Sequence, residues 1–400
     1  MPSMQLYIHV PFCRARCRYC TFHSLALGKN SAAPSLVRQY VDTLLLELAL
    51  WGDRLGSQTI STVFFGGGTP SILPVQAVAA VIARIRRYFE LEKGAEITLE
   101  GNPESLLERN YLADLISAGI NRISVGMQSF HAPHLKMLGR IHSASDAVHT
   151  VMAARSAGAQ NVSLDLMWGL PGQGVRQWLM MLREVLRLRP EHLSLYALTL
   201  EAGTPLEEDW RQGKVELPPE RDQALMYVEG AQLLEAAGYI HYEISNFARM
   251  GFQCRHNVGY WEGADYLGLG PSATSTLSGR RWTNPHVALE WAAAVKSGVL
   301  DADAEVLSPQ TRVLELIMLR LRTSRGLRVK AYRDLTGRDF LRDHKSLIHA
   351  LHERGLIRIR NGYLRFTRSG MLVSNSILAK FFADTEAKFL AADTPSALDA

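Results

Sequence analysis

The sequence predicts an α/β protein with a mainly parallel sheet, followed by a smaller α+β unit. Short apolar runs rich in β-forming residues alternate with helical patterns up to about residue 200, and a different order of helices begins near residue 306. Strands that alternate with helices pair in parallel. From the residues alone, two architectures remain open for the first part, a (β/α)n barrel and a doubly wound sheet.

Six strand-like runs and five helical patterns make up the first half of the chain. The strands are expected at 5–10, 61–67, 96–102, 122–128, 161–169 and 192–199. The helices are expected between them, at 34–56, 74–89, 105–119, 144–158 and 175–190. Gly119 and Gly158 lie where two of these helices should end, because glycine commonly closes a helix.

Each of the six runs ends in polar or glycine residues. In parallel α/β sheets, ligands bind beyond the carboxyl ends of the strands, so these residues should converge on one mouth. A packed core has no use for charged and amide side chains at such positions. The residues expected at this mouth are Cys13, Gly66 to Gly68, Glu100, Asn102, Gln128, Asp165, Ala197 and Thr199.

Three of the four cysteines lie in one short stretch, as C-x3-C-x2-C at Cys13, Cys17 and Cys20. Three thiolates on one loop can hold three irons of a 4Fe–4S cluster and leave the fourth iron open to a small molecule. The alternative is a zinc site completed by His9 or His23, although structural zinc sites usually combine two paired arms of ligands. A disulfide framework is not expected from so few cysteines.

The second half of the chain contains a helix followed by a strand within 220–250, and then a glycine-rich segment at 254–276, which is expected to be a functional loop. From about residue 306, three helical patterns precede a hairpin centred on Asn361-Gly362, a pair typical of tight hairpin turns. This order is that of a winged helix. The expected domains are 1–300 and 301–400.

The sequence predicts neither a membrane span nor a signal peptide. No apolar run approaches the ~18–20 residues that a span needs, and the first residues lead directly into a strand-like pattern. A small number of unpaired cysteines suits a reducing compartment. The expected location is the cytoplasm, with membrane association only through partners.

These motifs resemble the radical S-adenosylmethionine (SAM) superfamily, through CxxxCxxC with Tyr19 before the last cysteine and GGGTP at 66–70. The resemblance implies a partial (β/α)6 barrel and a 4Fe–4S cluster on Cys13, Cys17 and Cys20. The open iron of that cluster would bind the methionine amino and carboxylate groups of SAM.

Within the superfamily, the chain is similar over nearly its whole length to the anaerobic coproporphyrinogen III oxidase group, HemN and its relatives. The similar segments are YIHVPFC, FFGGGTPS, LEGNPES, RISVGMQSF, LDLMWGLPGQ and LSLYALTLEAGTPL. The SAM site that this similarity implies consists of Tyr7, Tyr19, Gly67, Gly68, Thr69, Glu100, Gln128, Arg140, Asp165 and Ala197.

Three departures from the oxidase pattern favour the haem-chaperone branch of this group, the HemW type. Phe22 stands where the oxidases have a fourth cysteine, the cluster motif begins already at residue 13, and CRHNVGYW at 254–261 is similar to HNxxYW of HemW proteins. The resemblance implies haem transfer to acceptor haemoproteins, including respiratory-chain proteins, with His256 or Cys254 as haem ligand. The alternative is oxidative decarboxylation of coproporphyrinogen propionates.

The basic charge is concentrated in the C-terminal unit. Between Arg312 and Arg368 there are 15 Lys or Arg and five Asp or Glu, although the net charge of the whole chain is only +5. Such a surface can bind nucleic acid, attract haem propionates or an acidic acceptor protein, or form a solvated lid. We favour the lid or protein docking and do not expect nucleic acid, because acidic residues interrupt the basic charge and no dense basic run alternates with aromatic residues.

Overall fold

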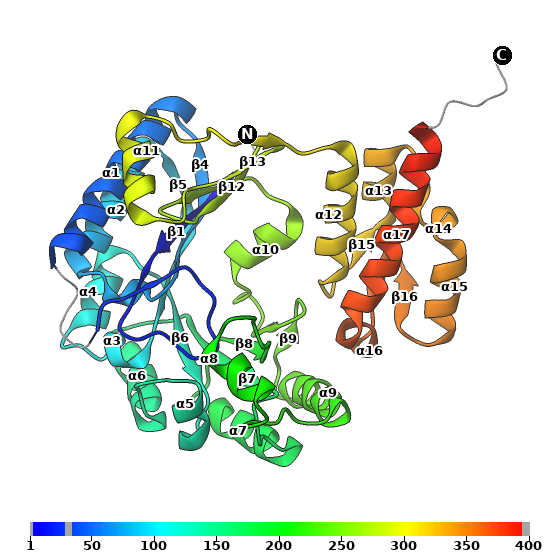
Figure 1. The fold of residues 1–400 in the computed structure, drawn as a ribbon, viewed down its shortest axis with the longest axis horizontal. Helices are drawn as coiled ribbons and strands as arrows, with labels where there is room; N and C mark the ends of the chain where they lie inside the picture. The colour runs from blue at the N-terminus through cyan, green and yellow to red at the C-terminus, as the bar shows by residue number, and fades with distance from the viewer. Residues whose placement is uncertain (1–2, 29–33, 394–400) are drawn as a thin grey trace.

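The computed structural model describes residues 3–28 and 34–393, which form a large barrel-like unit and a smaller C-terminal unit beside it (Figure 1). Six parallel strands form the wall of the larger unit, and they neighbour one another in chain order, which confirms the partial (β/α)6 barrel. A doubly wound sheet would reverse its strand order. The six strands are β1 (Met4–Val10), β4 (Thr59–Gly67), β5 (Glu90–Gly101), β6 (Arg122–Gln128), β7 (Val162–Trp168) and β8 (His192–Ala197).

Helices cover the outside of this wall at the positions that the sequence predicted. The predicted helix at 105–119 is divided, because Asn110 adopts a left-handed φ of 61° and the chain starts a new helix after it. The connecting helices are α1 (Pro34–Leu55), α2 (Val75–Tyr88), α3 (Pro103–Leu106), α4 (Tyr111–Ala118), α5 (Ala132–Met137), α6 (Ala144–Ser156), α7 (Val175–Arg187), α8 (Pro205–Arg211), α9 (Glu220–Ala236) and α11 (Ala288–Ser297). A 3-10 turn at Pro70–Ile72 follows β4, and the short strands β2 (Phe12–Cys13) and β3 (Leu25–Ala26) pair within the cysteine loop.

Within the described residues, the sheet stays open instead of closing into a ring. At one edge, β8 pairs with the antiparallel strand β10 (Asn246–Ala248), which in turn pairs with β9 (Ile240–His241). At the other edge, β1 pairs with β11 (Tyr266–Leu269), which leads to β12 (Thr274–Leu277), β13 (Arg280–Thr283) and β14 (Glu305–Val306). Helix α10 (Arg255–Glu262) lies between these edges (Figure 1).

The prediction of a functional loop at 254–276 is therefore wrong, because this segment forms α10, β11 and most of β12. Its glycines have structural roles. Gly263 ends α10 with a φ of 69°, and a Cβ on Gly268 would lie 2.2 Å from the Thr274 carbonyl oxygen, so only glycine lets β11 and β12 approach this closely.

Side chains on the six strands alternate between two environments. Those such as Leu6, Ile8 and Val125 pack against the helices in a core that extends from Met4 to Leu300. The opposite phase faces the inside of the barrel and is largely polar. Parallel strands buried on both faces are usually apolar throughout. The polar side chains that face the interior therefore indicate that it binds a ligand or carries out chemistry. They include Gln5, Tyr7, His9, Thr62, Glu96, Thr98, Glu100, Arg122, Ser124, Ser163, Asp165, His192 and Ser194.

Helix α10 closes the amino-terminal end of the barrel. The buried carboxylate of Glu96 accepts hydrogen bonds from the backbone N–H groups of Arg255 (3.1 Å) and His256 (3.2 Å) and from the thiol of Cys254 (3.5 Å). A carboxylate at a helix N-terminus is stabilised both by the free N–H groups and by the helix dipole. Glu96 therefore anchors α10, which we call the floor of the barrel because it closes the amino-terminal end of the interior.

The C-terminal unit has its own core, which extends from Val313 to Phe381. The hairpin turns over Asn361 and Gly362, which have φ values of 54° and 77°, as a tight turn of this kind requires. The expected boundary at 300/301 lies between the two cores and stays a prediction. The elements are α12 (Pro309–Leu321), β15 (Leu327–Arg328), α13 (Val329–Thr336), α14 (Phe340–Asp343), α15 (Lys345–Glu353), β16 (Ile357–Arg360), β17 (Tyr363–Phe366), α16 (Arg368–Leu372) and α17 (Ser374–Asp393).

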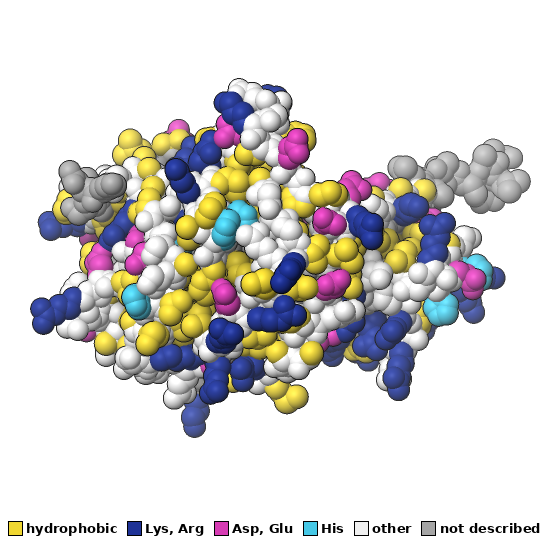
Figure 2. Space-filling view, turned by 90° about the horizontal axis from the view of Figure 1, so that it is seen from below, with side chains coloured by type: hydrophobic (Ala, Val, Ile, Leu, Met, Phe, Trp, Pro, Cys, Tyr) yellow, Lys and Arg dark blue, Asp and Glu magenta, His cyan; other side chains and the backbone are white. Residues whose placement is uncertain are grey.

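Part of the basic charge of this unit holds it against the barrel. Arg320 and Arg325 form ion pairs with Glu262 of α10, and Arg368 pairs with Glu235 of α9. Other Lys and Arg side chains face solvent on the lobe at the right of Figure 2. Among the described residues, no helix has the length and apolar character to cross a membrane.

The anchoring role of Glu96 gives a first prediction. Glu96→Ala should lower the free energy of unfolding by roughly 1.5–3 kcal/mol, because hydrogen bonds to a buried charged group are lost together. The matched control is Glu92→Ala, which removes a surface ion pair with Arg255 and should change stability by about 1 kcal/mol or less. Urea unfolding followed by circular dichroism measures both, and equal midpoints for the two variants would contradict the anchoring role.

Candidate cluster and cofactor site

The carboxyl ends of the six strands and the cysteine loop enclose a cavity of about 400 Å³. The structure thus brings together nearly all of the residues that the sequence predicted for one mouth. Gly66 and Tyr7 are the exceptions, since neither lines the cavity. The predicted residues on the wall are Cys13, Cys17, Cys20, Tyr19, Gly67, Gly68, Thr69, Glu100, Asn102, Gln128, Arg140, Asp165, Ala197 and Thr199.

Met167, Tyr196 and Glu201 also line the cavity, and sequence reasoning did not select them. Met167 and Tyr196 lie two residues beyond Asp165 and Ser194, so they continue the inward phase of β7 and β8. Because every second side chain of a strand points to the same face, the sequence of these two strands could have identified Met167 and Tyr196 as residues of the cavity.

The three cysteine side chains are partly exposed and line this cavity together. The hydroxyl of Thr69 donates to the Cys13 sulfur at 3.5 Å, and Arg140 donates to the Cys17 sulfur at 3.4 Å. Burial, together with the neighbouring Cys17 and Cys13, raises the pKa of the Cys20 thiol, although a bound metal deprotonates such a thiol. Three cysteines on one wall are a suitable donor set for an iron–sulfur cluster.

Among residues 3–28 and 34–393, no three His, Cys, Asp or Glu side chains converge as the ligands of a single metal ion do. An iron–sulfur cluster does not require such convergence, because each thiolate binds a different iron.

The glycines after β4 hold the cysteine loop against the strand ends. The N–H groups of Gly68 and Thr69 donate to the carbonyl oxygens of Val10 (2.8 Å) and Phe12 (2.7 Å). A Cβ on Gly68 would lie 2.5 Å from the Phe12 carbonyl oxygen, so a larger residue would push the loop away. The GGGTP run therefore has a packing role here, and it also presents bare backbone to a ligand.

Arg140 connects three parts of the cavity wall. Besides the Cys17 sulfur, its guanidinium donates to the Gly126 carbonyl oxygen at 2.9 Å and to the side-chain oxygen of Asn102. It thereby joins the ends of β5 and β6 to the cysteine loop. All three contacts hold Arg140 in the wall of the cavity.

Two buried carboxyl groups line the cavity, that of Glu100 on β5 and that of Asp165 on β7. Burial, and then the nearby charge of Asp165, raises the pKa of Glu100 to about 8. Burial also raises the pKa of Asp165, whose carboxylate accepts a hydrogen bond from the Ser124 hydroxyl at 3.1 Å. At neutral pH one of the two carboxyl groups therefore retains a proton, as expected when like charges share a buried site. The pair can accept hydrogen bonds from hydroxyl or amino groups of a ligand.

Tyr7 does not line the cavity, but its hydroxyl contacts His9. The Tyr7 hydroxyl lies 3.2 Å from Nδ1 of His9, and Nε2 of His9 lies 3.2 Å from the His23 carbonyl oxygen. Burial lowers the pKa of His9, and burial followed by the charge of Glu100 raises that of Tyr7. Tyr7 therefore donates to a neutral His9, which donates to the cysteine loop.

The two residues predicted as haem ligands are enclosed by the barrel. His256 is 1% exposed and Cys254 is 0% exposed. The Nδ1 atom of His256 shares a hydrogen bond with the Thr62 hydroxyl at 2.7 Å, and its ring stacks on Phe64. Burial lowers the pKa of His256 to about 3. Both side chains are buried in this structure, so neither presents a ligand atom at the surface, and their role as haem ligands stays a prediction.

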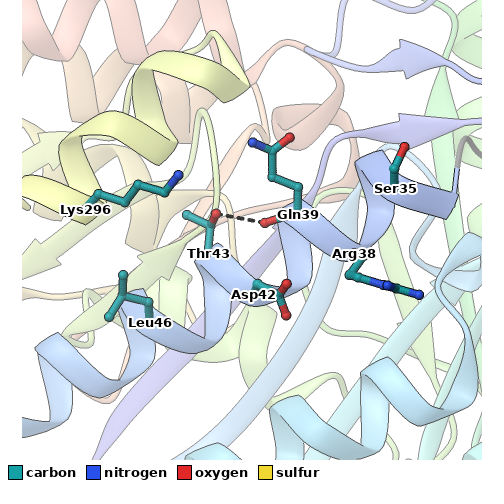
Figure 3. Close-up of a pocket in the computed structure, with 7 residues that line it drawn as sticks. All are labelled: Ser35, Arg38, Gln39, Asp42, Thr43, Leu46 and Lys296. Atoms are coloured by element: carbon teal, nitrogen blue, oxygen red, sulfur yellow. Dashed lines mark hydrogen bonds between the residues drawn. The ribbon is translucent and has the colours of Figure 1, made fainter.

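A second depression lies on the outer surface, between α1 and α11 (Figure 3). The Thr43 hydroxyl in it donates to the Gln39 carbonyl oxygen at 2.8 Å, within the helix itself. It shares no residue with the mouth of the barrel. Its lining consists of Ser35, Arg38, Gln39, Asp42, Thr43, Leu46 and Lys296.

The raised pKa of Glu100 predicts a pH-dependent stability. The folded protein holds a proton on Glu100 up to about pH 8, whereas the unfolded chain releases it near 4.5, so stability falls as the pH rises between these values. Glutamine does not ionise, so Glu100→Gln lacks this loss of stability. The difference between the Tm of the variant and the Tm of the wild type should therefore increase from pH 5.5 to pH 8.

Thermal unfolding of the metal-free protein across this range measures the effect, with the exposed Glu353→Gln as control. Glu47 and Glu243, whose pKa values burial also raises to about 7, are present in every variant, so their effect cancels in the difference. A constant Tm difference across the range would show that Glu100 ionises normally.

Comparisons with known proteins agree with this geometry. The profile of the Radical SAM superfamily matches residues 7–185, and that of the HemN C-terminal domain matches residues 307–373. A protein named heme chaperone HemW from Synechocystis sp. is 37% identical over 325 residues, which cover 80% of this chain and 78% of that protein. HemW from Bacillus subtilis is 31% identical over 380 residues, which cover 94% and 99% of the two chains.

The solved structure of coproporphyrinogen III oxidase (HemN) from Escherichia coli, described as a radical SAM enzyme, aligns with a TM-score of 0.81 at 22% identity. The alignment covers 95% of this chain and 90% of that one, and at this identity it shows a shared fold. Membership of the superfamily implies a 4Fe–4S cluster and SAM, which the three cysteines and the polar mouth suit. The chain therefore belongs to the HemN/HemW family of the radical SAM superfamily.

Proposed function

We propose that this protein is a haem chaperone that binds a 4Fe–4S cluster, SAM and haem and transfers haem to acceptor haemoproteins in the cytoplasm. Respiratory-chain proteins, reached through a membrane-associated partner, are the acceptors that we favour. The observation that carries the proposal is the identity of 37% to a protein named heme chaperone HemW, over 80% of this chain.

Cys13, Cys17 and Cys20 would hold the cluster, which when bound supplies an open iron for the amino and carboxylate groups of SAM. Their position on one cavity wall supports this assignment. Glu100 and Asp165 would accept hydrogen bonds from the amino and ribose hydroxyl groups of SAM.

Gly67, Gly68 and Thr69 would approach SAM with their backbone, while Tyr19, Gln128 and Ala197 would complete the walls around it. Tyr7 would support the site through His9. Arg140 would position Cys17 and the ends of β5 and β6, and it can also meet a carboxylate.

The main rival is coproporphyrinogen III oxidase activity, which the shared fold with HemN leaves open. Phe22, at the position of the fourth cysteine in the oxidase pattern, is 64% exposed beside the cavity mouth. An exposed phenylalanine at this place offers an apolar contact surface in place of a thiol. This difference favours the chaperone over the oxidase.

The basic C-terminal unit suits protein docking. Its exposed Lys and Arg side chains would attract an acidic acceptor, while Arg320, Arg325 and Arg368 are already engaged with the barrel. We propose docking of the acceptor protein at this unit and not binding of nucleic acid.

The cluster assignment predicts a specific dependence on the cysteine loop. After anaerobic reconstitution, Cys17→Ala should lose the broad iron–sulfur absorbance and nearly all bound iron and sulfide, because one of three ligands is missing. Cys254→Ala is the matched control and should keep them, since this thiol lies on the barrel floor and contacts Glu96. Equal iron contents for the two variants would contradict the assignment.

The function itself is tested by two parallel anaerobic reactions of the reconstituted protein with SAM and a reductant. In the first, protein loaded with haem is mixed with an apo-haemoprotein, and the absorbance of the acceptor reports transfer. In the second, coproporphyrinogen III is added, and mass spectrometry detects loss of CO2. The proposal expects transfer without decarboxylation; vinyl products would make the protein an oxidase.

A further inference from the structure

Two histidines that no proposed role includes lie together, and one of them, His23, stands in the chain between Phe22 and Ser24 of the cavity lining. His23 lies in the cysteine loop, three residues after Cys20, and His286 precedes α11, yet their rings stack with centroids 4.4 Å apart and planes inclined by 19°. Both side chains are exposed. Unlike the buried His256, both imidazoles are open to solvent.

The surroundings of His286 fix which of its nitrogens is free. Its Nδ1 atom shares a hydrogen bond with the Ser272 hydroxyl at 3.1 Å. This contact occupies Nδ1 and leaves Nε2 for a metal, the arrangement in which a second hydrogen bond orients a metal-binding imidazole. The backbone of His23 is fixed in turn, because its carbonyl oxygen accepts the hydrogen bond from His9.

Exposed apolar side chains flank both histidines. Phe22 and Leu25 are 64% and 53% exposed, and Val287 and Leu289 are 51% and 68% exposed. The stacked rings bring the segments 22–25 and 286–289 together, and we call these two segments the histidine rim. An apolar surface with an accessible imidazole matches the apolar faces and the iron of a haem.

Arg16 adds a complementary charge to this surface. Its side chain is exposed, and it lines the same cavity as Phe22 and Ser24. A guanidinium at this position can pair with one of the two haem propionates. The histidine rim therefore offers an iron ligand and apolar contacts, and Arg16 of the same cavity lining adds a cation.

We propose that the histidine rim binds haem, with Nε2 of His286 as an axial ligand of the iron and His23 packed against the ligating ring. This inference rests on the proposed haem-chaperone function and assigns the haem to the open mouth of the barrel. Phe22 then contacts the macrocycle, which gives a role to the residue that separates this chain from the oxidase pattern.

The test is a titration of the full-length chain with hemin, for the wild type, His286→Ala, His23→Ala and His149→Ala. His149 is an exposed histidine of α6 and serves as the matched control. His286→Ala should shift the Soret band and weaken hemin binding roughly tenfold or more, and added imidazole should restore the wild-type spectrum. His149→Ala should match the wild type, and His23→Ala should show a smaller loss.

The outcomes separate this inference from the function on which it depends. If the wild type binds hemin and His286→Ala has the same spectrum and affinity, the histidine rim is not the site, while the chaperone function stands. If the wild type does not bind hemin at all, both proposals fall. Circular dichroism and iron–sulfur content of each variant show that the fold and the cluster site are intact.

Discussion

The polar interior of an open parallel barrel is the constraint on which the rest of this structure depends. Charged groups removed from water must find counter-charges or hydrogen bonds, and here Arg122, Glu96, Glu100 and Asp165 all face one interior. At the amino-terminal end, the backbone of α10 and the thiol of Cys254 satisfy Glu96. At the carboxyl-terminal end, Glu100 and Asp165 remain directed into the cavity beside the cysteines. The floor is thus closed by the protein, and the mouth is left for ligands.

The cysteine loop is held as firmly as the wall that it covers. Arg18, between the second and third cysteines, donates its N–H to the Leu138 carbonyl oxygen (3.0 Å), accepts from the Leu206 N–H (2.9 Å) and pairs with Asp209. Together with the N–H groups of Gly68 and Thr69 on the carbonyl oxygens of Val10 and Phe12, these bonds fix the start and the middle of the loop before any ligand binds. Such preorganisation reduces the ordering that cluster binding would otherwise require. The Leu25 N–H, which donates to the Pro11 carbonyl oxygen at 2.7 Å, fixes the end of the loop next to Phe22 and His23.

The sequence predicted the six strands, their helices and most of the mouth, because these depend on local patterns and on one rule about the carboxyl ends of parallel strands. It failed where long-range packing decides. The glycines of 254–276 indicated a loop, yet Gly268 serves a close strand contact and Gly263 ends a helix. His256 belongs to a suggestive motif, but its burial comes from Thr62 and Phe64, nearly 200 positions earlier in the chain. The pairing of His23 with His286 is equally invisible in the sequence.

The central claim is that the cysteine loop and the strand ends form a single site in which SAM meets an open iron of the cluster. The most direct measurement is the electron paramagnetic resonance spectrum of the reduced, reconstituted protein with and without SAM, repeated with Glu100→Gln. A single site predicts that SAM changes the signal of the wild type and that the variant needs a higher SAM concentration for the same change. A cluster signal that SAM leaves unchanged in the wild type would contradict the account.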